Sequence, residues 1–151
     1  MKKSLWIALA CVVCLAGNAF AVDRKFGVGL IIGEPTGASA KLWGPKNTAF
    51  QFAVAVSFQD ESALHLHGDF VYHKHDLFDV ERGSLPLYYG AGLRIKFFDA
   101  DELIGVRLPI GLNYLFEDDP FDAFIEVVPI IDLSPDTDFS INASIGARYY
   151  F

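Results

Sequence analysis

Apolar residues recur at every second position through most of this chain. Because neighbouring side chains of a β-strand point to opposite faces, this period gives each strand one apolar and one polar face. Turn-forming residues divide the pattern into eight runs: 25–32, 38–43, 48–58, 64–73, 85–97, 103–116, 123–132 and 139–151. No segment has a helical period. The sequence therefore predicts an all-β protein with eight antiparallel strands.

The two faces differ in a way that bears on their surroundings. The apolar face carries no charge, as in Phe50-x-Phe52-x-Val54-x-Val56, whereas the other face is rich in glycine, serine and charged residues. A soluble ligand-binding barrel would turn its apolar face inward and expose a Lys- and Glu-rich surface. Small residues instead fit a narrow lumen. We therefore predict an up-and-down transmembrane β-barrel, with the soluble periplasmic barrel as an alternative.

Composition and aromatic positions favour the same architecture. The chain is 52% hydrophobic and 15% aromatic, yet after the N-terminal region no run approaches the roughly 18 apolar residues of a membrane-spanning helix. Aromatic residues gather near the strand ends, which is typical of the interfacial girdles of membrane barrels. One rim is predicted to hold Phe26, Tyr72, Tyr89, Tyr114, Phe116, Tyr149 and Phe151, and the other Phe58, Phe97, Phe98 and Phe139.

The N-terminus predicts export. Lys2 and Lys3 precede an apolar stretch at 5–16, and Ala19-Phe20-Ala21 fits a cleavage site. We expect a cleavable signal peptide at 1–21 and one barrel domain at 22–151; a lipoprotein using Cys11 or Cys14 is the alternative. Both cysteines would leave with the signal peptide, which excludes a disulfide framework. The net charge of −7 argues against nucleic acid as a partner.

The C-terminus carries a separate signal. Ser144, Gly146, Tyr149 and Phe151 resemble the C-terminal sorting signal of bacterial outer-membrane barrels. An even number of strands puts both chain ends on one side, which that signal would make periplasmic. The connections at 33–37, 59–63, 98–102 and 133–138 would then face outward, and the longest connection, at 74–84, would face the periplasm.

Several segments together carry a family resemblance. The segments 33–37, 86–94, 107–116, 124–129 and 146–151 resemble a group of short, uncharacterised outer-membrane barrels. The group is similar in architecture to the OmpX class and to the membrane domain of OmpA. The resemblance implies a bacterial outer-membrane location and an eight-stranded fold. The expected partners are outer-membrane lipids, lipopolysaccharide and the barrel-assembly machinery, around a monomer.

Charged residues on the predicted inner face are the candidate site. A buried charge must be paired and hydrogen-bonded, so we predict a lumen charge network that plugs the barrel, with an ion or proton path as the alternative. Planar arginine side chains suit bidentate carboxylate pairing. Arg94, Arg107 and Arg148 are therefore the expected partners of Asp69 and Glu126. The predicted network comprises Lys41, Asp69, Arg94, Lys96, Arg107, Glu126 and Arg148.

Other chemistry is weakly supported by the sequence. His65, His67, His73 and His75 share one parity, but the two pairs would lie near opposite rims, so we predict no metal site and no cofactor. A cluster of Ser62 and His65 with Asp60 and Glu61 is a weak catalytic signal, because His65 would face inward; we expect no enzyme. We interpret the acidic residues of the outward loops as parts of solvated turns. The alternative is that they bind divalent cations that bridge lipopolysaccharide. An adhesive surface protein is disfavoured by the short outward loops.

Two prolines lie inside predicted strands. Pro109 and Pro129 each remove one donor from a ladder, and a closed barrel has no free edge at which to place them. We therefore expect bulges or local water at both positions.

Overall fold

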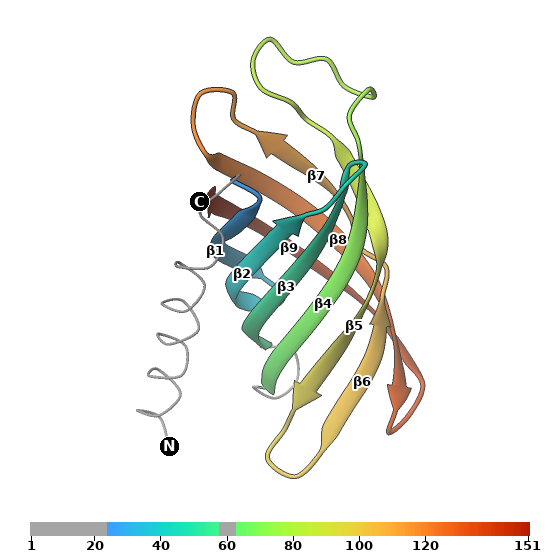
Figure 1. Cartoon of the computed structure of the whole chain (residues 1–151). Helices are drawn as coiled ribbons and strands as arrows, with labels where there is room; N and C mark the ends of the chain where they lie inside the picture. The colour runs from blue at the N-terminus through green and yellow to red at the C-terminus, as the bar shows by residue number, and fades with distance from the viewer. Residues whose placement is uncertain (1–23, 58–62) are drawn as a thin grey trace.

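The computed structural model describes residues 24–57 and 63–151. The predicted signal peptide and the predicted turn at 59–62 lie outside these ranges. The described chain forms nine antiparallel strands (Figure 1): β1 (Phe26–Gly33), β2 (Thr36–Trp43), β3 (Thr48–Ser57), β4 (Ala63–Lys74), β5 (Leu87–Phe97), β6 (Glu102–Arg107), β7 (Ile110–Leu115), β8 (Phe121–Ser134) and β9 (Asp138–Tyr150).

The strands form one ring. Each strand pairs with its neighbours in the chain, except that β6 and β7 do not pair with each other, and β1 also pairs with β9, from Gly27 opposite Tyr150 to Gly33 opposite Ser144. Both β6 and β7 lie between β5 and β8. A ring of this kind has no open sheet edge, so the protein is an all-β antiparallel barrel.

The count of nine strands differs from the eight predicted. The run predicted at 103–116 is divided at Leu108-Pro109 into β6 and β7. The register does not slip across the division: Arg107 pairs with Ile130 and Ile110 with Val127. A proline lacks the N–H that a ladder needs, and this accounts for the interruption. The two short strands therefore follow one continuous line in the wall.

The expected bulges at the two prolines need correction. Pro129 remains inside β8, opposite Ile141 of β9. Its carbonyl accepts a hydrogen bond from the Leu108 N–H at 3.0 Å, and the Pro109 carbonyl accepts one from Gly90 at 3.1 Å. The register shift in this part of the wall lies instead between Ile104 and Gly105. The two proline carbonyls thus keep the ladder bonded beside the interruption.

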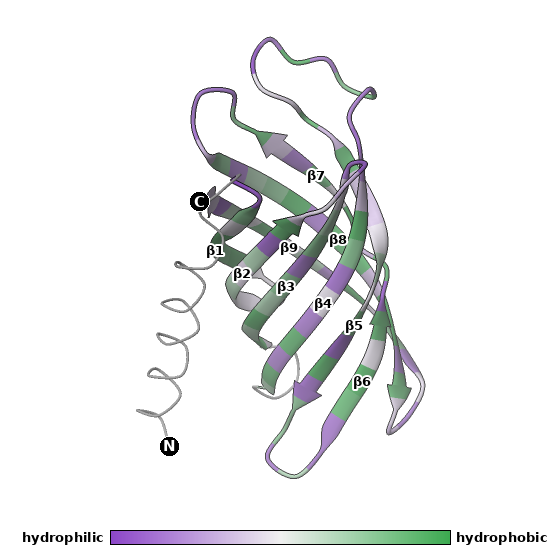
Figure 2. Ribbon diagram, in the orientation of Figure 1, coloured by the Kyte–Doolittle hydropathy of each residue, from purple (hydrophilic) through white to green (hydrophobic). Residues whose placement is uncertain are grey.

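The assignment of faces from the sequence is confirmed. Along β3, Phe50, Phe52, Val54 and Val56 are exposed, whereas the residues between them are buried. The same alternation is visible along the strands in Figure 2. Apolar side chains thus cover the outside of the barrel, and polar and charged side chains fill the inside.

Connections at the two ends of the barrel differ in length. The β1–β2, β5–β6 and β8–β9 connections have two to four residues. At the opposite end, β4 and β5 are joined by twelve residues, 75–86, which form the long loop near the β7–β8 connection (Figure 1). That same end carries the aromatic pairs Tyr72–Tyr89, Tyr114–Phe116 and Tyr149–Phe151, with ring centroids 4.8–5.9 Å apart. These pairs occupy the rim where the sequence places one aromatic girdle.

Candidate functional site

The candidate site is the charged interior of the barrel. All seven residues of the predicted network lie inside and are at most 6% exposed: Lys41, Asp69, Arg94, Lys96, Arg107, Glu126 and Arg148. Alternation along the strands brings them there, because each occupies the inward parity of its own strand. Their ion pairs form three groups along the barrel, described here from the short-turn end to the long-loop end.

Arg94 forms the first group. Its Nε and Nη2 donate to Oδ1 and Oδ2 of Asp132 at 3.0 and 2.6 Å, a bidentate geometry. Nη2 also donates to the Ser140 hydroxyl at 3.3 Å. The arginine therefore links β5 to β8 and β9.

Arg107 forms the second group. Its Nε and Nη2 donate to the two carboxylate oxygens of Asp69 at 3.0 and 3.2 Å, and Nη2 reaches Oε1 of Glu126 at 3.5 Å. The Tyr88 hydroxyl donates to the other Glu126 oxygen at 2.8 Å, and the Ser144 hydroxyl donates to Oε1 at 3.4 Å. Each of these two buried carboxylates thus has partners on both of its oxygens.

Arg148 and Lys41 form the third group. Arg148 donates from Nε to Asp122 at 3.0 Å, and the Tyr150 hydroxyl donates to the same carboxylate at 2.6 Å. Lys41 Nζ lies 4.0 Å from Asp122 and 2.5 Å from the Asn113 side-chain oxygen.

Lys41 also contacts a buried histidine, His73. Its Nζ lies 2.7 Å from Nε2 of His73. A carbonyl oxygen only accepts, so the proton of the neutral ring lies on Nδ1, which faces the Asn47 carbonyl, and Nε2 faces Lys41. From there Nδ1 donates to the Asn47 carbonyl at 3.3 Å.

Glycines on the inner face make room for these side chains. Asp69, Gly92 and Arg107 are opposite one another on three neighbouring strands, so the ion pair passes over the glycine. A Cβ on Gly92 would lie 2.6 Å from the Cα of Asp69. The same arrangement recurs in two further sets, Arg94–Gly105–Asp132 and Tyr88–Gly111–Glu126. The abundance of glycine on the polar face therefore has a direct structural reason.

The pairing predicted from the sequence is only partly the pairing observed. Arg107 binds both Asp69 and Glu126, whereas Arg94 and Arg148 bind other carboxylates. Sequence reasoning missed Asp132 and Asp122 as partners. Asp132 is the last residue of a predicted run and has the same parity as Glu126, so the parity rule could have found it. Asp122 lies one position before that run, outside the predicted strand.

Three of the four histidines are buried inside. His65 Nε2 lies 3.1 Å from His67 Nδ1, and His67 Nε2 lies 3.8 Å from Asp69. His75 instead lies near the rim, 3.1 Å from the Ser84 hydroxyl. No group of three or more His, Cys, Asp or Glu side chains suited to a metal ion is found in 24–57 and 63–151. The weak catalytic cluster depends on Ser62, Asp60 and Glu61, which lie outside the described residues.

The residues of the predicted sorting signal follow β9 to its end. Tyr149 and Phe151 are 41% and 45% exposed on the apolar exterior, whereas Ser144 is buried on the inner face. Gly146 lies opposite Phe124 on the inner face, and its position leaves space for that ring.

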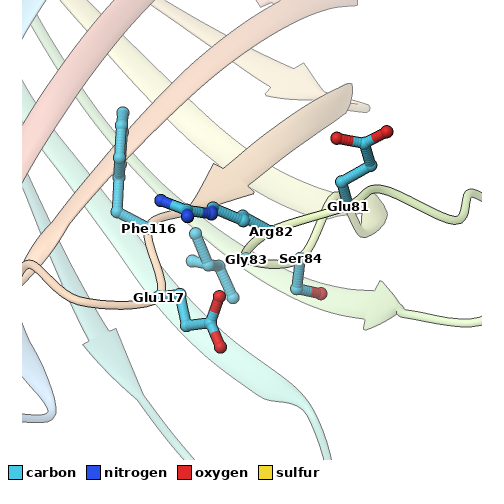
Figure 3. A pocket seen from close by; sticks show the side chains of 7 residues that line it. Glu81, Arg82, Gly83, Ser84, Phe116 and Glu117 are labelled. Carbon is cyan, nitrogen blue, oxygen red and sulfur yellow. The ribbon is translucent and has the colours of Figure 1, made fainter.

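A separate pocket lies at the long-loop end. Its volume is about 320 Å³, and it lies between the β4–β5 and β7–β8 connections (Figure 3). The lining residues are Glu81, Arg82, Gly83, Ser84, Leu115, Phe116 and Glu117. It is distinct from the charged interior.

Within 24–57 and 63–151, no helix has the length and apolar character that a membrane span requires.

Comparisons with known proteins bear on the fold. No family model matches the sequence, and no curated protein matches it. The structure is similar to the crystal structure of the N-terminal β-barrel domain of Pseudomonas aeruginosa OprF. The TM-score is 0.65 at 16% identity, over 83% of this chain and 96% of that domain. At this identity the likeness shows the β-barrel fold alone.

Proposed function

We propose that this chain is a bacterial outer-membrane β-barrel protein whose lumen is plugged by side chains, with a structural or surface-associated role rather than a catalytic one. The observation that carries the proposal is the distribution of polarity across a closed wall. Bulky apolar residues such as Leu30, Leu93 and Ile125 are 54–64% exposed outside, while arginines and carboxylates are buried inside. Such a surface is unfavourable in water and suits hydrocarbon.

The charged interior supports a structural role. Arg94–Asp132, Arg107–Asp69 and Lys41–Asp122 join strands that are not neighbours, so these contacts brace the wall across its inner side. Arg148–Asp122 joins the neighbouring strands β8 and β9. Burying these charges is costly, and the ion pairs and hydrogen bonds of the network offset that cost. We infer that the network holds the barrel in one geometry, and that the plugged lumen is a consequence of the same packing.

Location and partners follow from the same proposal. The fold is shared with the β-barrel domain of OprF, and the sequence predicts a signal peptide and a C-terminal sorting signal. We therefore propose an exported monomer in the outer membrane, inserted by the barrel-assembly machinery and surrounded by lipid and lipopolysaccharide. The described connections at the short-turn end have two to four residues, which leaves little surface for an adhesive role.

Cell fractionation combined with gel mobility tests this proposal. The protein should remain in the outer-membrane fraction and should migrate differently when it is loaded without boiling. The double variant Tyr149→Ser/Phe151→Ser should reduce the folded form, whereas Phe139→Ser, on the apolar exterior near the other rim, should reduce it less. Recovery in the aqueous fraction without detergent would contradict the proposal.

A further inference from the structure

The β4–β5 connection is unlike the other described connections. It spans twelve residues, 75–86, whereas the others have two to five. Long connections in compact domains are often functional. This loop lies beside the β7–β8 connection, 116–120, at the end where the chain's C-terminus lies (Figure 1).

One half of the loop is fixed to the barrel. Ser84 and Leu115 exchange two backbone hydrogen bonds of 3.0 and 2.8 Å, and the Tyr114 hydroxyl donates to the Arg82 carbonyl at 2.9 Å. Gly83 turns the chain there with a φ of +71°. These contacts anchor 82–86, so the segment 76–81 is presented from a fixed base.

The presented segment exposes large apolar side chains. Leu77 and Phe78 are each 46% exposed, and Val80 is 37% exposed. They lie beyond Tyr72, whose ring pairs with Tyr89 at the rim, so they belong to the end of the barrel and not to its apolar wall. Exposed apolar patches outside a membrane belt are typical of interaction sites.

The charged residues around Leu77, Phe78 and Val80 limit which kinds of partner these side chains can contact. The segments 75–86 and 116–120 together carry six acidic residues and one basic residue: Asp76, Asp79, Glu81, Glu117, Asp118 and Asp119 against Arg82. Acidic side chains repel an anionic lipid surface and attract a cationic partner. The adjoining pocket places the Phe116 ring and the Glu117 carboxylate beside the loop (Figure 3).

We propose that segments 75–86 and 116–120 form a docking surface for a basic, apolar peptide segment of another protein. The apolar residues of that segment would pack on Leu77, Phe78 and Val80, and its lysines or arginines would face the surrounding carboxylates. At the pocket, which Arg82 also lines, Phe116 and Glu117 would meet the stem and the charge of a lysine or arginine of that segment. The proposed function determines only on which side of the membrane the partner would lie. The docking surface itself does not depend on the proposed function.

Fluorescence anisotropy with the purified barrel in neutral detergent tests the proposal. The probe is a short labelled peptide of alternating lysine and leucine; peptides with serine for leucine or glutamate for lysine are controls. The lysine–leucine peptide should bind, and added salt should weaken the binding. Affinity should fall by about tenfold or more in Leu77→Ser/Phe78→Ser/Val80→Ser, and similarly in Asp76→Lys/Asp79→Lys/Glu81→Lys.

A matched control uses the opposite end of the barrel. Asp99→Lys/Asp101→Lys/Asp136→Lys reverses three exposed acidic residues there and should leave the affinity unchanged. An equal loss in this control and in the loop variants, or no binding by the unaltered barrel, would overturn the proposal. Gel mobility without boiling reports separately on the folded barrel, so failure of the docking surface is distinguishable from failure of the proposed function.

A lipid contact is the competing outcome. Trp43→Phe/Phe78→Trp places a fluorophore in the loop, and the barrel can be reconstituted with brominated lipid. Weak quenching is expected, because the loop should lie in water. Strong quenching at that position would show that the apolar residues enter the membrane, and would also overturn the proposal.

Discussion

The two faces of the barrel wall use the same strands under different constraints. Where β4 pairs with β5, Gly68 lies opposite Leu93 on the outer face, and Asp69 lies opposite Gly92 on the inner face. In the proposed membrane location the outer residues need only be apolar, because hydrocarbon would accept any such shape. The inner residues must match a particular partner across three strands. The residues of the outer face therefore determine which solvent the barrel suits, whereas the paired residues of the inner face determine the geometry of the barrel.

The largest expected effect is on the inner face. Arg107→Leu leaves Asp69 and Glu126 without their shared cation and should lower the free energy of unfolding by about 3–5 kcal/mol. Urea unfolding in lipid vesicles, followed by the fluorescence of Trp43, measures it. Adding Asp69→Leu should restore part of the loss, because one unpaired charge is removed. No restoration would mean that the pair is not the source of the effect.

A charge on the outer face should be nearly as costly. Val54 is 41% exposed near the middle of β3, and Val54→Arg should cost about 2–4 kcal/mol in the same assay. Val54→Leu is the control and should change stability by less than about 0.5 kcal/mol. Equal tolerance of both variants would show that this face does not meet lipid.

Two glycines on adjacent strands allow a direct test of packing. A Cβ on Gly92 meets backbone atoms of β4 closer than 3 Å, whereas a Cβ on Gly68 lies 3.4 Å from its nearest neighbour, in Phe52. Gly92→Ala should therefore cost about 1–3 kcal/mol. Gly68→Ala should be neutral. A larger loss of stability in Gly68→Ala than in Gly92→Ala would contradict the proposed role of glycine on the inner face.

The smallest expected effect comes from two neighbouring tyrosines. Tyr88 points inward and donates to Glu126, so Tyr88→Phe should cost about 1 kcal/mol. Tyr89 is 46% exposed outside, and Tyr89→Phe should stay within about 0.5 kcal/mol. Comparison of the two unfolding midpoints measures the difference, and a larger loss at Tyr89 would contradict the proposed asymmetry.

Local patterns in the sequence predict much of the fold. Alternation and turn residues locate the strands to within a few positions, and parity separates Val54 from Gln51 correctly. Alternation alone predicts one continuous strand through Pro109, because the missing N–H acts only through the ladder bonds to two neighbouring strands. Pro129, with the same chemistry, stays inside β8.

The charged interior is less accessible to sequence reasoning. Parity identifies which residues face inward, but the choice of partner depends on register and on the tilt of the wall. Arg94 reaches Asp132 across Gly105, and these positions are far apart in the chain. The alternation within one strand contains no information on such pairs, so parity alone predicts Asp69 and Glu126 as the partners of all three arginines.

The junction of β1 with β9 has a consequence for biogenesis. Residues 27–33 pair with 144–150, so β1 cannot form this pairing until the last part of the chain has been synthesised. Until then β1 has unpaired backbone groups along one edge, which invite association with other chains. A nascent polypeptide interrupted before residue 144 cannot complete the seam, and this makes late truncation far more harmful than its small loss of mass suggests.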